Sequence, residues 1–343
     1  MTQKKTTLKS MAKQLNVSTA TISNAFNRPN QLSEALRERI LKECELLGYT
    51  GPSITARSLR TGKTGIIGVL LADSLSYNFS DPVATEFLAG ISQTLDEHHV
   101  NMLLLPTKID NYKNTQVETI PDSFIVYGKP ADSKVLSLIK CQHKPTVLVD
   151  FKEAELPSIN VDNFHASYQI AKHAIQSKDD HVLVFALKLN AESAITLESL
   201  ENLYNIDEAI SRSRFDGYVK AMSEIGVSFD HSQVWQLHDL DPSITKHLIR
   251  GALTSSKKVD VLLCMSDKFA ISALEVASEL GLSVPNDLRI VGFDGIPQSQ
   301  AHGLSTVEQP IKHKGEIAAR MVLGELPNHS MTLDTKVIVR SSG

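Results

Sequence analysis

Two successive series of alternating strand-like and helical segments constrain the fold of this 343-residue chain more than any other feature. Helical stretches at 83–98, 163–177, 208–225 and 267–281 separate continuous apolar runs rich in Val, Ile and Leu. The first series of runs lies at 65–73, 100–106, 123–128 and 146–150, and the second at 181–187, 234–239, 259–265 and 288–294. Continuous apolar strands are typical of parallel sheets covered on both faces. The pattern therefore predicts an α/β core of two doubly wound lobes with a cleft between them.

The charge of the chain is divided unevenly along its length. Residues 1–64 hold eleven lysines and arginines against four glutamates, a net charge of +7. The remaining residues hold 24 basic and 35 acidic side chains, a net charge of −11. A basic head on an acidic body is the charge distribution expected of a protein that binds the phosphate backbone of nucleic acid. A solubilising basic tail is the alternative.

Three short helices are predicted within the basic head. Thr7, Ser18 and Ser33 are N-cap candidates for these helices. Apolar residues follow them at helical spacing: Leu8, Met11, Ala12 and Leu15, then Ile22, Ala25 and Phe26, then Leu36, Ile40, Cys44 and Leu47. Three short helices with a tight turn between the first two describe a helix-turn-helix module, whose second helix enters the major groove of DNA.

The second predicted helix begins with short polar side chains, which allow its backbone to approach base edges closely. Thr and Ser can bond a base or a phosphate, Ala can contact a thymine methyl, and Asn suits adenine. An ordinary exposed helix is the alternative interpretation. The predicted DNA-contacting residues of the head are Thr7, Leu8, Ser18, Thr19, Ala20, Thr21, Ser23, Asn24, Asn27 and Arg28.

The stretch "TLKSMAKQLNVSTATISNAFNRPNQLSEALRERILKECELLGY" resembles the DNA-binding head of the LacI/GalR (lac repressor) family of bacterial transcription regulators. The following "GPSITARSLRTGKTGIIGVLLAD" is similar to the family's hinge and first core strand. The resemblance implies a helix-turn-helix domain over 1–51, a hinge over 52–64, and an effector-binding and dimerisation domain over 65–343. Asn24 departs from the arginine that the family often carries, and "YTGPS" is one residue longer than the commonest form.

The predicted hinge segment "PSITARSLRT" is too short to form a stable helix alone. In the family this stretch becomes helical when two copies pack on DNA, and a leucine from each wedges into the minor groove. Leu59 holds the matching position, and the small Ala56 lies about one turn before it. Arg57 and Arg60 are placed to reach phosphates. Such wedging bends the duplex. An ordinary linker is the alternative.

The resemblance also implies a periplasmic-binding-protein-like core whose chain crosses between the lobes three times, near 162–165, 292–296 and 320–325. The expected N-lobe comprises about 65–163 and 294–322, and the C-lobe about 164–293 and 323–343. The segment 188–207 is longer and more acidic than the family's usual connection. It is either a lid or an oligomer contact.

Ligands of such sheets bind beyond the carboxyl ends of the strands, where carboxylates and aromatic rings suit a polyhydroxylated or heterocyclic molecule. The residues that follow predicted strands are Asp73, Asp150, Phe151, Ser266, Asp267 and Asp294. "SRFDGYVKAM" resembles the family's Arg-x-x-Gly-aromatic signature, which implies that Arg214 lies in the cleft. The same comparison suggests Phe79, Asp81 and Leu240. Strand-end caps and surface ion pairs are the alternative roles.

Motifs for catalysis, cofactors or metals are absent from the sequence: it contains no GxxxxGK[ST], GxGxxG or HExxH. We therefore expect no enzyme, cofactor or metal site. The absence of an apolar span, of a signal peptide and of paired cysteines indicates a cytoplasmic protein without a membrane partner. The whole predicts a sequence-specific DNA-binding regulator, expected to be a repressor. It would act as a homodimer or a dimer of dimers on a palindromic operator, under the control of a sugar, nucleoside or purine.

Two alternatives remain from the sequence. One is a two-lobed solute-binding protein, or a hydrolase on the same scaffold, with an incidental basic head. The other is a regulator controlled by a partner protein.

Overall fold

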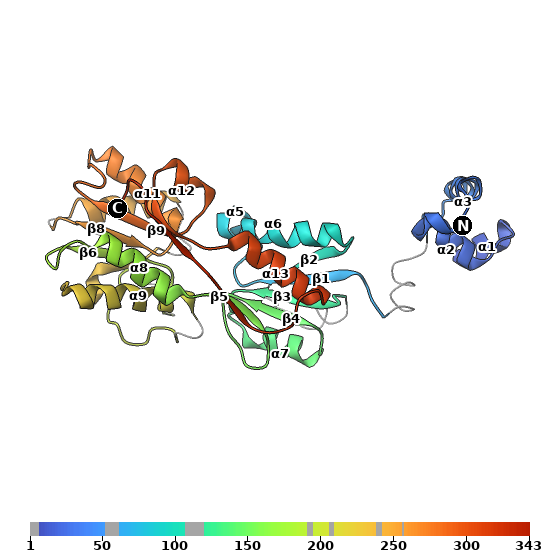
Figure 1. Cartoon of the computed structure of the whole chain (residues 1–343), viewed down its shortest axis with the longest axis horizontal. Coiled ribbons are helices and arrows are strands. Elements are labelled where there is room, and N and C mark those ends of the chain that lie inside the picture. Colours follow the sequence, from blue (N-terminus) through green and yellow to red (C-terminus); the bar gives the residue numbers. More distant parts are fainter. Residues whose placement is uncertain are drawn as a thin grey trace. The chain divides into compact units, whose positions relative to one another are not determined.

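The computed structural model describes residues 7–51, 62–106, 120–190, 195–205, 209–237, 242–255 and 257–343. The chain divides into two compact units, 1–65 and 66–343 (Figure 1). We call the first the head and the second the core, and we describe each separately. The predicted hinge contacts Ala56, Arg57, Leu59 and Arg60 and the predicted pocket residue Leu240 lie outside the described residues, so they stay predictions.

The head contains the three expected helices, α1 (Leu8–Gln14), α2 (Thr19–Asn27) and α3 (Glu34–Leu46). The Thr7 side chain accepts the Ser10 backbone N–H at 3.2 Å, and the Ser18 hydroxyl accepts the Thr21 backbone N–H at 2.9 Å. Each cap satisfies an otherwise unpaired N–H of a first helical turn, which is why α1 and α2 begin where the sequence predicts.

A small apolar core holds these three helices together. The fully or nearly fully buried side chains are Met11, Ala12, Leu15, Ile22, Ala25, Ile40, Cys44 and Tyr49. The ring of Phe26 meets that of Tyr49 edge-on, with centroids 5.9 Å apart. Because the apolar face of α2 is buried in this core, its polar face is left exposed.

The core contains two six-stranded sheets, one in each lobe. The N-lobe sheet has the order β11 (Met331–Leu333), β5 (Ser158–Val161), β4 (Thr146–Val149), β3 (Ser123–Tyr127), β1 (Ile66–Leu71), β2 (Asn101–Pro106). The C-lobe sheet has the order β12 (Lys336–Ile338), β10 (Ser305–Glu308), β9 (Arg289–Asp294), β8 (Val261–Cys264), β6 (Val182–Ala186), β7 (Val234–Gln236). Each described pair is parallel except β10 with β12. This confirms the predicted doubly wound α/β core.

Helices cover the faces of both sheets (Figure 1). Their bounds are α5 (Leu75–Ser80), α6 (Pro82–Glu97), α7 (Ser133–Cys141), α8 (Asn163–Ala174), α9 (Ile210–Ile225), α10 (Pro242–Leu253), α11 (Asp267–Glu279), α12 (Pro297–Ala301) and α13 (Ile311–Leu323). Two pairs pack closely at glycines, α6 with α13 at Gly90 and Gly315, and α8 with α9 at Gly217. None of the described helices is long and apolar enough to cross a membrane.

The crossings between the lobes differ in part from the expectation. The first lies between β5 and α8, within the predicted 162–165 region. The second was expected near 292–296, but after β9 the chain forms α12 and returns to the same sheet as β10. It therefore crosses between β10 and α13, near Gln309. The third, expected near 320–325, lies between β11 and β12. The N-lobe thus ends its first segment near 162 and includes α13 and β11, while the C-lobe includes β10 and β12.

Candidate functional sites

The N-terminal end of α2 carries an exposed polar surface. Ser18, Thr19 and Ala20 are exposed, and so are Asn27, the last residue of the helix, and Arg28, which follows it. The half-buried Thr21, Ser23 and Asn24 lie between them. Unpaired backbone N–H groups at a helix N-terminus attract anions, and short side chains allow close approach to a duplex. The predicted reading surface is therefore accessible in the folded head.

Hydrogen bonds within the head orient several of these side chains. The Asn27 amide donates to the Ser23 carbonyl at 2.9 Å, and the Asn24 amide donates to Gln31 Oε1 at 3.0 Å. Gln31 was not predicted from the sequence, because seven residues separate it from its partner. The half-buried Leu8 packs against the core of the head, so only part of its side chain is available for the predicted DNA contact.

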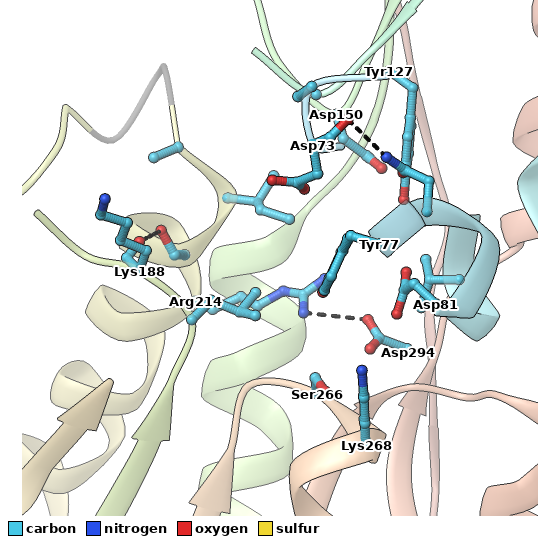
Figure 2. A pocket seen from close by; sticks show the side chains of 18 of the residues that line it. Asp73, Tyr77, Asp81, Tyr127, Asp150, Lys188, Arg214, Ser266, Lys268 and Asp294 are labelled. Carbon is cyan, nitrogen blue, oxygen red and sulfur yellow. Dashed lines mark hydrogen bonds and ion pairs between the residues drawn. The ribbon is translucent and has the colours of Figure 1, made fainter. Parts of the chain in front are cut away.

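A pocket of about 580 Å³ lies between the two lobes of the core, beyond the carboxyl ends of strands from both sheets. Figure 2 shows Tyr77 near its centre, with Asp73, Tyr127 and Asp150 on the N-lobe side and Ser266, Lys268 and Asp294 on the C-lobe side. Six of the predicted residues line it: Asp73, Asp81, Asp150, Arg214, Ser266 and Asp294. Within each lobe, the carboxyl ends of the parallel strands lie along one edge of the sheet, so the residues that follow the strands come close together.

Arg214 extends from α9 into the base of this pocket with only 3% of its side chain exposed. Its Nε donates to Asn163 Oδ1 at 2.9 Å, and its Nη1 donates to the Met265 carbonyl at 2.5 Å and to Asp294 Oδ1 at 3.3 Å. The guanidinium also stacks on Phe293, 3.6 Å from the ring centroid. These contacts fix the orientation of the Arg214 guanidinium and direct it toward the Asp294 carboxylate, whose charge it neutralises.

Asp294 occupies the centre of a buried polar group. Burial raises its pKa to about 6, Arg214 opposes this shift, and the nearby Asp81 adds to it. Its Oδ1 also accepts the Gln309 amide N–H at 2.8 Å. At the opposite wall Asp150, in a left-handed backbone conformation with φ of 65°, accepts the Lys314 ammonium at 2.5 Å. The pocket therefore presents carboxylates from both lobes, each held by a cation.

Three predicted pocket residues lie elsewhere. Phe79 is 61% exposed and faces a separate, smaller depression beside Pro297 and Gln298. Phe151 is buried in the apolar cluster beneath α7. Asp267 is fully buried and accepts the backbone N–H groups of Gly295 and Ile296 and the Thr306 hydroxyl. For Phe151 and Asp267 the cause is that consecutive residues after a strand point in different directions, so a strand-end position alone does not decide which side chain reaches the cleft. Phe79, which the resemblance suggested, lies on helix α5.

Asp267 instead anchors the turn that follows β9. Burial raises its pKa to about 8, and repulsion from Asp294 adds to the shift, while its three hydrogen-bond donors oppose it. A Cβ at Gly292 would lie 2.2 Å from Asp267 Oδ1, so the carboxyl fits only because that residue is glycine. Asp267 is a structural support of the pocket wall that holds Asp294.

Other lining residues were not predicted, among them Tyr77, Tyr127, Lys129, Lys188, Tyr204, Lys268, Phe269 and Gln309. Burial, together with the nearby negative charges of Asp150, Asp81 and Asp294, raises the pKa of the Tyr127 phenol, which therefore keeps its proton. Tyr204 belongs to the segment 188–207, and its N–H donates to the Leu189 carbonyl at 2.8 Å. Leu189 and Leu197 are buried in the C-lobe core. Lys188 and Tyr204 of this segment thus line the pocket.

Comparisons with known proteins agree with both units. Residues 204–342 match the model of a periplasmic binding protein-like domain. The chain is 32% identical to the HTH-type transcriptional regulator Rv3575c of Mycobacterium tuberculosis over 94% of this chain and 91% of that protein. A LacI family regulator from Corynebacterium glutamicum has a similar structure, with 26% identity, a TM-score of 0.68 and 99% coverage of both chains.

Two more distant structures share the fold. The lac repressor dimer bound to operator and an anti-inducer is 17% identical, with a TM-score of 0.73 and 99% coverage of both chains. A LacI family regulator from Enterococcus faecium with bound ribose is 19% identical, with a TM-score of 0.64, over 81% of this chain and 98% of that one. The relatives are transcriptional regulators rather than enzymes. On its sequence, its head and its two-lobed core, the chain belongs to the LacI family of HTH-type transcriptional regulators.

Proposed function

We propose that this regulator is a repressor that binds a palindromic operator as a homodimer, and that a neutral, hydroxyl-rich small molecule in the pocket controls its affinity for DNA. The single observation that carries the effector half of this proposal is the pocket itself, which gathers side chains from both lobes at the carboxyl ends of their strands. The similar lac repressor, which is a dimer on its operator, supports the oligomeric half.

The DNA half of the proposal rests on the exposed start of α2. One head presents few base-contacting residues, so two heads related by two-fold symmetry would be needed to specify a site of operator length. A two-fold protein reads a palindrome because each head meets the same half-site sequence. The predicted hinge contacts at 52–61 would join the two heads on the DNA, and they remain part of the proposal.

The effector class follows from the chemistry of the pocket walls. Among the described lining residues, the carboxylates Asp73, Asp81, Asp150 and Asp294 face four cations, Lys129, Lys188, Arg214 and Lys268, and the buried Lys314 pairs with Asp150 from behind the wall. A site whose charges nearly cancel favours a neutral ligand, and carboxylates accept hydrogen bonds from hydroxyl groups. Tyr77, Tyr127, Tyr204 and Phe269 offer rings for the apolar face of a sugar or a base. A sugar or a nucleoside therefore fits better than a charged metabolite. The bound ribose of the Enterococcus faecium relative supports this class.

Control would operate through the two lobes. A ligand that contacts both walls binds one arrangement of the lobes better than another and shifts the population toward it. If that arrangement changes the separation of two hinges, DNA affinity changes with it, by a coupling of about 1–3 kcal/mol in typical allosteric proteins.

The DNA half is tested by selecting duplexes from a random pool with the full-length protein, using a 65–343 fragment as the control. We expect a palindromic motif for the full chain and none for the fragment. Equal enrichment by the two proteins would contradict the proposal.

The effector half is tested by thermal unfolding of the full-length protein against ribose, cellobiose, inosine and hypoxanthine. A bound ligand stabilises the folded state by mass action, so a member of the proposed class should raise the midpoint. If no member of the panel raised the midpoint, the proposed class would be contradicted.

A further inference from the structure

A buried lysine connects the carboxylates of the two pocket walls without lining the pocket itself. Lys314 lies in the first turns of α13, with 2% of its side chain exposed, among the buried residues Ile311, Gly315 and Ala318. Its Nζ donates to Asp150 Oδ1 at 2.5 Å and to Gln309 Oε1 at 2.7 Å. An ammonium in such a place loses its hydration, and an apolar side chain would pack there at a lower desolvation cost.

The chemistry of the ammonium decides how Gln309 is oriented. An ammonium has three donors and no acceptor, so the Gln309 amide must turn its oxygen toward Lys314. Its Nε2 then faces the other way and donates to Asp294 Oδ1 at 2.8 Å. If Lys314 were apolar, the Gln309 oxygen would lose this donor, and the amide would be held less firmly in its contact with Asp294.

The hydrogen bonds form one continuous path across the molecule. It begins at Asp150, which follows β4 of the N-lobe, and passes through Lys314 and through Gln309 at the second crossing between the lobes. From Gln309 it reaches Asp294, which ends β9 of the C-lobe, and Arg214 of α9. Both carboxylates on this path line the pocket. Charge-assisted bonds of this kind are shorter and stronger than neutral ones, so the path holds both carboxylates in defined directions.

We propose that Lys314 is a positioning residue of the effector pocket: through Asp150 directly, and through Gln309 for Asp294, it sets the direction in which each lobe's carboxylate meets the ligand. The inference rests on the proposed function of the pocket in binding a hydroxyl-bearing molecule. On this proposal, a residue outside the pocket would determine which hydroxyl positions the ligand must have.

The first test needs no ligand. Crystal structures of the full-length wild type, K314M and the control K312M would be compared, because Lys312 is an exposed lysine of the same helix. In K314M we expect the Asp150 carboxylate to leave its position and the Gln309–Asp294 hydrogen bond to be lost, with K312M unchanged. If K314M leaves Asp150 unpaired and fails to fold, the D150N/K314M variant, which removes both charges, takes its place. Unchanged Gln309 and Asp294 positions in either variant would overturn the proposal.

The second test measures affinity for whichever sugar or nucleoside of the panel stabilises the wild type. We expect K314M to bind it at least tenfold more weakly, K314Q to recover part of the loss because its amide retains N–H donors, and K312M to match the wild type. Wild-type affinity in K314M would overturn the positioning role. If no panel member stabilises the wild type, the proposed ligand class fails, and the ligand-free structures alone decide for or against Lys314.

Discussion

At the scale of single residues, buried charges determine both the stability of the pocket and its chemistry. Arg214 satisfies three acceptors, one of them the Asp294 carboxylate, from a position almost without solvent. Asp267 supports the same wall from beneath through two backbone N–H groups and Thr306. Removing one partner of such a group costs more than the hydrogen bond itself, because the other partner is left buried without its hydrogen bond or counter-charge.

Replacement of Arg214 is expected to weaken folding as well as ligand binding. In R214A the buried Asp294 loses its counter-charge, which should lower the free energy of unfolding by about 3–5 kcal/mol in urea denaturation. The matched control is R212A, two residues away on α9, where a partly exposed pair with Asp216 would contribute below about 1 kcal/mol. Similar losses in the two variants would contradict the structural role assigned to Arg214.

Asp267 is expected to make stability depend on pH. Because burial raises its pKa from 3.8 to about 8, the folded state keeps a proton that the unfolded state releases between these values. The free energy of unfolding contributed by this group therefore falls as pH rises through that window, by at most about 1.4 kcal/mol per pH unit. The difference between wild type and D267N, measured by urea unfolding from pH 5 to 8, should show this slope. Parallel profiles would rule it out.

At the scale of elements, glycines set how closely the helices of the core approach. An added Cβ at Gly90 of α6 would lie 2.0 Å from the Lys312 carbonyl oxygen of α13, and one at Gly315 of α13 would lie 2.2 Å from the Phe87 carbonyl oxygen. Both distances are too short for a carbon and an oxygen in contact. Since α13 also carries Lys314, this close packing positions the cation relative to Asp150 on β4.

The G90A and G315A variants should each force the two helices apart. Overpacking of this kind typically costs about 1–3 kcal/mol, which thermal or urea unfolding would detect. Gly251, near the end of α10, is the control, because nothing lies within 4 Å of an added Cβ there. G251A should be neutral or stabilise by up to about 1 kcal/mol through the higher helix propensity of alanine. Equal effects at Gly90 and Gly251 would contradict the packing account.

At the scale of the whole molecule, the uneven division of charge separates DNA binding by the head from the proposed ligand binding in the core. The net charge of +7 over residues 1–64 attracts the phosphate backbone, whereas the net charge of −11 over the rest repels it. DNA binding should therefore depend on the head, and the pocket should be free to select a neutral ligand without competing for nucleic acid.

Affinity for DNA is expected to fall steeply with salt because each phosphate contact releases counterions. With about six phosphate contacts over two heads, affinity should fall roughly a thousandfold between about 50 mM and about 200 mM salt. Fluorescence anisotropy of a labelled duplex with the full-length protein would measure the slope. A flat salt dependence would contradict the role of the basic head.

The sequence alone determined the parts of this protein that depend on local patterns. The caps at Thr7 and Ser18, the apolar spacing of the head, and the continuous runs that became β1 and β9 are readable because each signal lies within about ten residues. The strands β5 ("SINV") and β10 ("STVE") were missed because they are short and partly polar, and the second crossing was misplaced as a result.

The residues in and around the pocket fall into the same two groups, those that local patterns predict and those that depend on tertiary contacts. Asp73, Asp150 and Asp294 could be predicted because parallel strands bring their carboxyl ends to one edge. Gln309, Lys314 and the burial of Asp267 could not, since each depends on contacts between residues far apart in the chain. Only the tertiary structure decided which side chains at those strand ends line the pocket and which support its wall, because that choice depends on the direction of each side chain after its strand ends.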